Sequence, residues 1–202
     1  MSRRSVLFDL DGTLVDLRRL HWRALNKALS EAGLDQISHE DHVTRFDGLS
    51  TRTKLEMLGV PQWLRDTVAD AKQAHTLKMI ASEVRPDSRL LGELAKIEQH
   101  LFIGVVSNAL LDTCVPVLMR SGLGRHVKLL IAGPHQFGKP HPSPYLKAIT
   151  AAHLDPNECV AVEDNHYGVQ SADAAGLSCI EVTGPKDITF DLVMRAFAQV
   201  PA

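Results

Sequence analysis

Long hydrophobic runs are missing from this sequence of 202 residues. No stretch approaches the roughly 18 apolar residues that would span a bilayer. The first apolar run, residues 6–8, stops at Asp9, so the basic residues 3–4 begin no export signal. We therefore expect a cytoplasmic protein that has no membrane partner.

An excess of charge of either sign is also absent. Lysine and arginine together number 22, and aspartate and glutamate 24, which gives a formal net charge of -2. Such a balance produces no overall basic field that would attract nucleic acid or an anionic membrane. Any attraction for an anionic ligand must therefore be local.

Cysteine is scarce, and the three that occur, Cys114, Cys159 and Cys179, show no metal-type spacing. They stand far apart in apolar surroundings, such as the run 159–162. Free cysteine is commonly buried, and reduced thiols are typical of the cytosol. We expect three reduced, buried thiols with no chemical role.

The apolar residues that are present, 45% of the chain, are enough to fill a core. Short β-branched or aliphatic runs end in Asp, Ser, Asn or Gly, and helical patterns separate the later runs. This alternation predicts an α/β fold with a parallel, doubly wound, Rossmann-like sheet. The predicted strands are 5–10, 101–106, 128–132, 159–162 and 179–182, and the predicted helices are 88–99, 111–121, 144–153, 166–175 and 188–199.

Residues 16–86 break this rhythm, because their pattern is helical throughout. Helices are predicted at 18–32, 51–58 and 62–83, with glycines between them. We predict a catalytic core of residues 1–15 and 87–202 and an inserted helical cap of residues 16–86. Ligands of open α/β sheets bind beyond the carboxyl ends of the strands, where the insert starts and where it can act as a lid.

Two carboxylates follow the first predicted strand. Strand side chains alternate with a period of two, so Asp9 and Asp11 lean to the same side. Paired carboxylates repel each other, and a divalent cation between them relieves the repulsion. Oxygen-only ligands favour Mg²⁺ over zinc. A strand that ends in an ordinary turn at Asp11-Gly12 is the alternative reading of this pair.

The whole string of residues 8–16 resembles the first motif of the haloacid dehalogenase superfamily, Asp-x-Asp-Gly-Thr. Each later match has a plainer alternative: a turn residue, a surface lysine or a helix cap. The matches nevertheless follow the family's order along nearly the whole chain. The pairs that resemble the second, third and fourth motifs are Ser107-Asn108, Lys139-Pro140 and Glu163-Asp164.

The resemblance implies a phosphoryl-transfer enzyme with an aspartyl-phosphate intermediate. Asp9 would be the nucleophile, and Asp11 would protonate the leaving oxygen and then activate water. Dehalogenases of the family lack the second aspartate, so Asp11 favours phosphoryl transfer over cleavage of a carbon-halogen bond. Ser107, the backbone near Asn108 and Lys139 would bind the phosphoryl oxygens.

The same resemblance implies a Mg²⁺ cofactor. Asp164 would ligate the ion together with the Asp9 carboxylate and the Asp11 carbonyl. Glu163 would support the metal directly or through a water molecule.

The insert resembles the small helical cap of sugar-phosphate phosphatases, phosphoglycolate-type phosphatases and beta-phosphoglucomutase. His21, Arg52 and Lys72 stand in contexts similar to those of the mutase and are candidate substrate contacts, with solvated side chains as the alternative. Leu17 replaces the polar residue common after the first motif, which weakens the mutase reading.

Two histidine pairs have loose metal-like spacing, His39 with His42 and His135 with His141. We expect them to be structural or solvated, since the carboxylates already account for a metal.

The favoured function is thus a Mg²⁺-dependent phosphatase of a small phosphorylated metabolite such as a sugar phosphate. A phosphotransferase similar to beta-phosphoglucomutase shares every core residue and is the alternative. A non-catalytic binding protein on the same fold is disfavoured by the complete catalytic set. The predicted partner is a small-molecule phosphate ester, and the predicted assembly is a monomer or a small homo-oligomer.

Overall fold

The computed structural model describes residues 4–46, 48–133 and 137–198. The chain divides into two compact units. One, the core unit, takes in the chain up to Asp16 and from Arg85 onward. The other, the cap unit, is Leu17–Val84.

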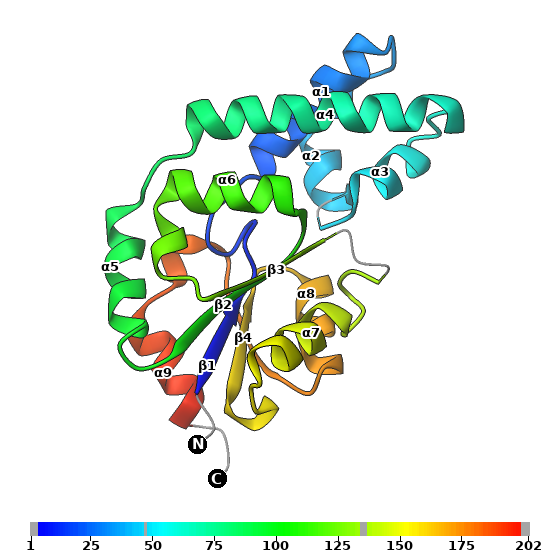
Figure 1. Cartoon of the computed structure of the whole chain (residues 1–202). Coiled ribbons are helices and arrows are strands. Elements are labelled where there is room, and N and C mark those ends of the chain that lie inside the picture. The colour runs from blue at the N-terminus through cyan, green and yellow to red at the C-terminus, as the bar shows by residue number, and fades with distance from the viewer. Residues whose placement is uncertain (1–3, 47, 134–136, 199–202) are drawn as a thin grey trace. The chain divides into compact units, whose positions relative to one another are not determined.

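The core unit is built on a parallel sheet, with the strand order β3-β2-β1-β4-β5 among the described residues (Figure 1). Its central strand, β1, is fully buried, as a continuous apolar run between two neighbouring strands requires. This arrangement confirms the predicted α/β fold class. The strands are β1 (Ser5–Phe8), β2 (Phe102–Leu110), β3 (Leu129–Gly133), β4 (Cys159–Glu163) and β5 (Ser178–Glu181).

Helices cover both faces of this sheet. Figure 1 shows α5 and α9 on one face and α7 and α8 on the other. Buried side chains of α7 and α8 form one apolar cluster with β1, β2 and β4. The helices of the core unit are α5 (Ser88–Ile97), α6 (Leu111–Ser121), α7 (Ser143–Ala152), α8 (His166–Ala174) and α9 (Phe190–Ala198).

Most elements differ from their predicted bounds by one or two residues, and β2 differs by four at its end. Helix α9 begins two residues after the predicted start, because Thr189 caps it: its Oγ1 accepts a hydrogen bond from the Leu192 N–H at 3.1 Å. Strand β2 runs to Leu110 rather than 106, with an irregular register between Ser107 and Leu110. Ser107 still pairs with Ala132, so the irregularity frees Asn108, the second residue of the motif, from regular pairing.

The register of the sheet brings the motifs to one edge. Phe8 lies opposite Val105 on β2 and Val162 on β4. The next residue, Asp9, still donates its N–H to the Val162 carbonyl at 2.9 Å. The residues that follow these positions on all three strands therefore meet at the carboxyl edge, where open α/β sheets bind ligands.

The thiols are free, as expected, but not all are buried. Cys114 and Cys159 are buried, while Cys179 is half-buried because it lies on β5 at the edge of the sheet. Burial raises the pKa of Cys114 to about 12, so this thiol stays protonated and unreactive.

The cap unit is helical. Its core joins α1, α3 and α4 through buried residues such as Leu25, Leu55 and Val68. A short α-helix and a π-helix lie between the predicted helices 18–32 and 51–58, where the sequence pattern predicted no helix. Both are too short to show an apolar period. The helices are α1 (Arg18–Glu31), α2 (His39–Asp41), the π-helix His42–Phe46, α3 (Thr51–Met57) and α4 (Gln62–Glu83).

None of the helices in the described part of the chain has both the length and the apolar character that crossing a membrane would demand.

Candidate active site

The first motif forms a tight loop directly after β1. The N–H groups of Leu14 and Val15 both donate to the Leu10 carbonyl. Gly12 adopts a left-handed φ of 95°, and a Cβ there would lie 1.9 Å from Asp164 Oδ2. Only glycine fits this conformation and this close approach. The glycine of the motif thus lets the fourth motif pack against the first.

Lys139 is the cation at the centre of the site, and its side chain is almost completely buried. Its Nζ donates to Asp9 Oδ1, to Glu163 Oε1 and to the Val106 carbonyl, each at 2.6 Å. Burial lowers the pKa of Lys139, but the two carboxylates more than offset it and raise this pKa above its ordinary value. Lys139 therefore carries its charge throughout the working pH range.

Asp9 has one engaged oxygen and one that is not. Its Oδ1 accepts from Lys139, while its buried Oδ2 has no hydrogen-bond partner. Burial raises the pKa of Asp9 from 3.8 to about 7; the Lys139 charge opposes this rise and Glu163 adds to it. The buried, unpaired Oδ2 is costly unless another ligand satisfies it.

Asn108 orients Lys139 through its backbone. The amide oxygen of Asn108 accepts from the Lys139 N–H at 2.8 Å, and its Nδ2 donates to the Lys139 carbonyl at 3.1 Å. Gly138 is needed here, since a Cβ would stand 2.7 Å from Asn108 Oδ1. Ser107 is buried beside it, and its Oγ accepts from the Ala109 N–H at 3.1 Å. The second and third motifs are thus joined by side-chain contacts.

Glu163 is completely buried at the end of β4. Besides Lys139, its Oε1 accepts a hydrogen bond from the Tyr145 hydroxyl at 2.5 Å. Sequence reasoning missed Tyr145, because its place in the apolar period of α7 indicated only core packing. A buried tyrosine hydroxyl usually requires a polar partner, and that was the one available signal.

A cation fits among these carboxylates. Asp9, Glu163 and Asp164 each offer an oxygen, and these atoms all lie within 4.8 Å of one another. Asp9 Oδ2 and Glu163 Oε2 are buried and have no hydrogen-bond partner. Buried carboxylate oxygens are costly when unpaired, and a hard divalent cation satisfies them. Asp11 lies outside this side-chain cluster, in a β-bridge with Val15, consistent with a contribution from its backbone carbonyl alone.

The structure brings two of the three cap candidates together. Lys72 Nζ lies 3.3 Å from His21 Nδ1. Arg52 instead forms an exposed ion pair with Asp66 at 2.8 Å, where solvent screens the charges. The structure therefore pairs Lys72 with His21 and gives Arg52 an acidic partner on α4.

His39 and His42 belong to no metal-ligand cluster in the part of the chain that the structure describes. His39 packs edge-on against the Trp22 ring, whereas His42 is buried with neither ring nitrogen hydrogen-bonded. The pKa of His42 is lowered from 6.5 to about 3, chiefly by burial. Neighbouring basic side chains add to this lowering of the pKa, and Lys54 contributes most among them. His135 lies outside the described residues, and His141 Nδ1 accepts from the Ser143 N–H at 3.1 Å.

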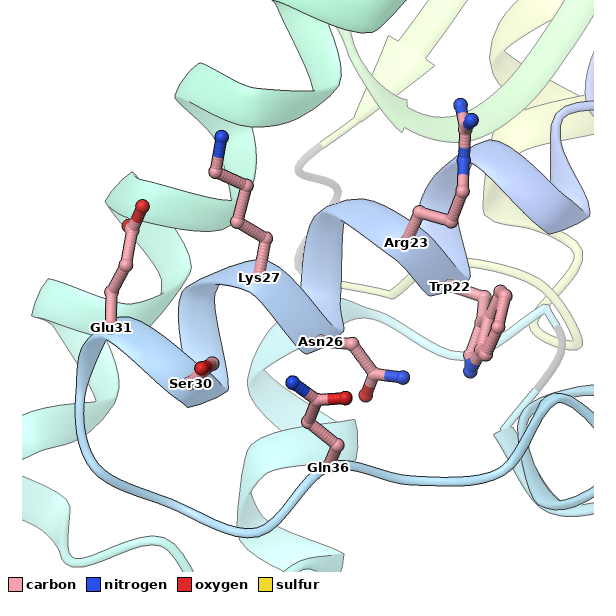
Figure 2. A pocket seen from close by; sticks show the side chains of 7 residues that line it. All are labelled: Trp22, Arg23, Asn26, Lys27, Ser30, Glu31 and Gln36. Atoms are coloured by element: carbon pink, nitrogen blue, oxygen red, sulfur yellow. The ribbon is translucent and has the colours of Figure 1, made fainter.

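The cap unit also has a hollow of about 470 Å³ beside α1 (Figure 2). Its polar side chains already support the neighbouring loop: Trp22 Nε1 donates to the Ile37 carbonyl, and Asn26 exchanges two hydrogen bonds with the Ile37 backbone. None of the candidate catalytic residues lines it. We therefore assign this hollow no part in the chemistry.

Comparison with known proteins identifies the class of this fold and site. Residues 6–182 match the family described as haloacid dehalogenase-like hydrolase, and the chain belongs to this family.

Among its relatives, phosphoglycolate phosphatase of Aquifex aeolicus is 30% identical over 176 residues, covering 86% of this chain and 81% of that protein. Hexitol phosphatase A of Escherichia coli is 29% identical, with 99% and 94% covered. These findings confirm the predicted family. The predicted enzyme class, a phosphomonoester hydrolase, agrees with the names of these relatives.

Solved structures show the same fold. Beta-phosphoglucomutase from Clostridium difficile aligns with a TM-score of 0.83 at 18% identity, covering 98% of each chain. CbbY from Rhodobacter sphaeroides, solved in complex with phosphate, aligns with a TM-score of 0.80 at 21% identity, covering 93% of this chain and 90% of that one. At such identities the likeness establishes the fold alone.

Proposed function

We propose that this chain is a Mg²⁺-dependent phosphatase that hydrolyses a small phosphorylated metabolite, a sugar phosphate or a similar monoester, through an aspartyl-phosphate intermediate. The observation that carries the proposal is the buried network in which Lys139 bridges Asp9 and Glu163 beside Asp164. Relatives by sequence are named phosphoglycolate phosphatase, hexitol phosphatase A and N-acetylmuramic acid 6-phosphate phosphatase, and these names support the substrate class.

The geometry favours Asp9 as the nucleophile. The Asp9 carboxylate attacks phosphorus, and the hydrogen bond from Lys139 to its Oδ1 holds the side chain in place. The phosphorus bond to the ester oxygen breaks as the new bond forms, and Asp11 gives its proton to the departing alcohol. Asp11 then takes a proton from water, which attacks the aspartyl phosphate, releases inorganic phosphate and restores Asp9.

Charge stabilisation accompanies both displacements. Ser107, the backbone N–H groups near Asn108 and the Lys139 ammonium donate to the phosphoryl oxygens. The carboxylates of Asp9, Glu163 and Asp164, with the Asp11 carbonyl, would hold Mg²⁺. When bound, the ion supplies positive charge against the phosphoryl oxygens.

Three side chains of the cap unit, His21, Arg52 and Lys72, are proposed substrate contacts. The short contact of Lys72 with His21 supports a joint role for these two. Arg52 is the weakest of the three, because its guanidinium already has Asp66 as a partner.

A mutase similar to beta-phosphoglucomutase is the less supported alternative. It would use the same core residues but pass the phosphoryl group to a sugar hydroxyl. The structural likeness to such a mutase shows the fold alone, whereas several relatives by sequence are named phosphatases.

Release of inorganic phosphate tests the proposal. The enzyme is incubated with Mg²⁺ and either p-nitrophenyl phosphate or a panel of phosphorylated metabolites, and Asp11→Asn serves as the control. We expect turnover of p-nitrophenyl phosphate and a marked preference for at least one sugar phosphate. Formation of glucose 6-phosphate from beta-glucose 1-phosphate and a bisphosphate primer at an enzymatic rate would favour the mutase. No turnover of any compound would overturn both functions.

A further inference from the structure

The chain has two tyrosines, and only Tyr145 is buried, with an exposed fraction of 0%. It lies on α7 and belongs to none of the four motifs. Its hydroxyl nevertheless donates to Glu163 Oε1 at 2.5 Å, and its ring centroid lies 5.2 Å from Lys139 Nζ. Tyr145 thus contacts two members of the catalytic network without belonging to it by sequence.

Glu163 is held from two sides. Its Oε1 receives two donors, the Tyr145 hydroxyl and the Lys139 ammonium. Its carboxyl group also packs closely on Gly168, where a Cβ would stand 2.0 Å from Oε2. The other oxygen, Oε2, is buried without a hydrogen-bond partner. Because both donors bind Oε1, Oε2 is the oxygen that remains for another ligand.

The two donors to Oε1 differ in what else they must do. Lys139 is shared among Asp9, Glu163 and the Val106 carbonyl, and the proposed mechanism also directs it to the phosphoryl group. The Tyr145 hydroxyl donates to Glu163 Oε1. The hydrogen bond from Tyr145 to Glu163 therefore need not change during the reaction, whereas the contacts of Lys139 must.

We propose that Tyr145 is a positioning residue of the metal site: it holds the Glu163 carboxylate so that Oε2 is presented to Mg²⁺ or to a water molecule bound to the ion. The inference rests on the proposed function, because it assumes a metal among these carboxylates. Hydrogen-bond partners of metal-supporting carboxylates commonly change metal affinity by about 10-fold to 100-fold.

The test is Tyr145→Phe, which removes the hydroxyl and keeps the ring. Calorimetric titration with Mg²⁺ in the absence of substrate gives the Kd. We expect the variant's Kd to rise on the order of tenfold. The KM for p-nitrophenyl phosphate at saturating Mg²⁺ should stay near that of the wild type. Tyr167→Phe is the matched control, because it removes the hydroxyl of the other, exposed tyrosine and should leave the Kd unchanged.

A second measurement avoids any change at residue 145. Tyr167→Phe protein labelled with fluorotyrosine carries a single fluorine, on Tyr145. Its NMR resonance should shift on titration with Mg²⁺.

An unchanged Kd in Tyr145→Phe, with the wild type binding Mg²⁺ normally, would overturn the inference and leave the proposed function intact. A loss of thermal stability without any change in Kd would likewise reduce Tyr145 to a packing residue. If the wild-type enzyme binds no Mg²⁺, the proposed function and this inference fall together.

Discussion

At the scale of single residues, the chemistry depends on one carboxylate oxygen of Asp9. Replacing Asp9 by Asn keeps the shape of the side chain, but the amide is neither a nucleophile nor a good metal ligand. Turnover of p-nitrophenyl phosphate with Mg²⁺ should fall by about 10⁴-fold or more. Circular dichroism should show an intact fold. Retention of more than a small fraction of the activity would rule out the assigned nucleophile.

Lys139 has a structural consequence as well as a catalytic one. Lys139→Met leaves the buried carboxylates of Asp9 and Glu163 without their cation. Breaking a buried ion pair from one side typically costs about 3–5 kcal/mol. Urea unfolding in EDTA should show a loss of that order, smaller with Mg²⁺ present because the ion replaces part of the charge.

The control for Lys139→Met is Lys96→Met, which removes the exposed partner of Glu93. Exposed ion pairs contribute about 0–1 kcal/mol, so this variant should unfold like the wild type. Equal stability of the two variants in EDTA would contradict the central place given to Lys139.

The candidate site shows what single-residue patterns can predict. Asp9 and Glu163 were identifiable because each follows an apolar run, and parallel strands bring such ends together. The contact between Asn108 and the Lys139 backbone joins residues 31 apart in the sequence, and no periodic pattern reports it. Tyr145 was hidden for the same reason, since only the folded chain places its hydroxyl on Glu163.

At the scale of elements, the π-helix His42–Phe46 begins with a histidine whose two ring nitrogens lack hydrogen-bond partners. The pKa of His42 is lowered from 6.5 to about 3. Above pH 6.5 the histidine is neutral in both folded and unfolded chains, so it adds no pH dependence. Below that value the unfolded chain takes up a proton that the folded chain does not bind until about pH 3, and stability is lost as the pH falls.

His42→Phe should remove this acid sensitivity. The wild-type unfolding constant should rise by up to about tenfold per pH unit below pH 6.5 from this one proton. The variant should lose that part of the dependence, which urea unfolding between about pH 7 and pH 5 measures. His100→Phe, at an exposed histidine, is the matched control for replacing an imidazole by a phenyl ring. Parallel pH curves for wild type and His42→Phe would show that His42 does not resist protonation.

Long periodic elements were predictable, and short ones were not. The central strand β1 is a continuous apolar run and α4 is a long helix, so the existence of both followed from the sequence. The π-helix His42–Phe46 is a single turn without such a period. The extension of β2 beyond residue 106 was also missed, because polar residues 107 and 108 interrupt its apolar run. Polar residues after an apolar run usually indicate the end of a strand, but here they belong to the strand and to the candidate active site.

At the scale of the whole molecule, function should depend on the metal. Activity should require Mg²⁺ and be inhibited by Ca²⁺, which prefers higher coordination and would misplace the attacking carboxylate. Mg²⁺ should also raise the Tm, because an ion that binds only the folded state stabilises it. Assays with EDTA, Mg²⁺ and Ca²⁺, together with thermal unfolding, check both effects. Undiminished turnover in EDTA would contradict the proposed metal centre.

The strand order also bears on how the enzyme is made. Strand β1 is synthesised before both of its neighbours in the sheet, which begin only at Phe102 and Cys159. Until the second of them has been synthesised, β1 cannot complete its hydrogen bonding, and Asp9 has no Glu163 or Asp164 beside it. A nascent chain therefore lacks the assembled site until β4 has been synthesised, and the apolar strand β1 must be shielded from aggregation during that time.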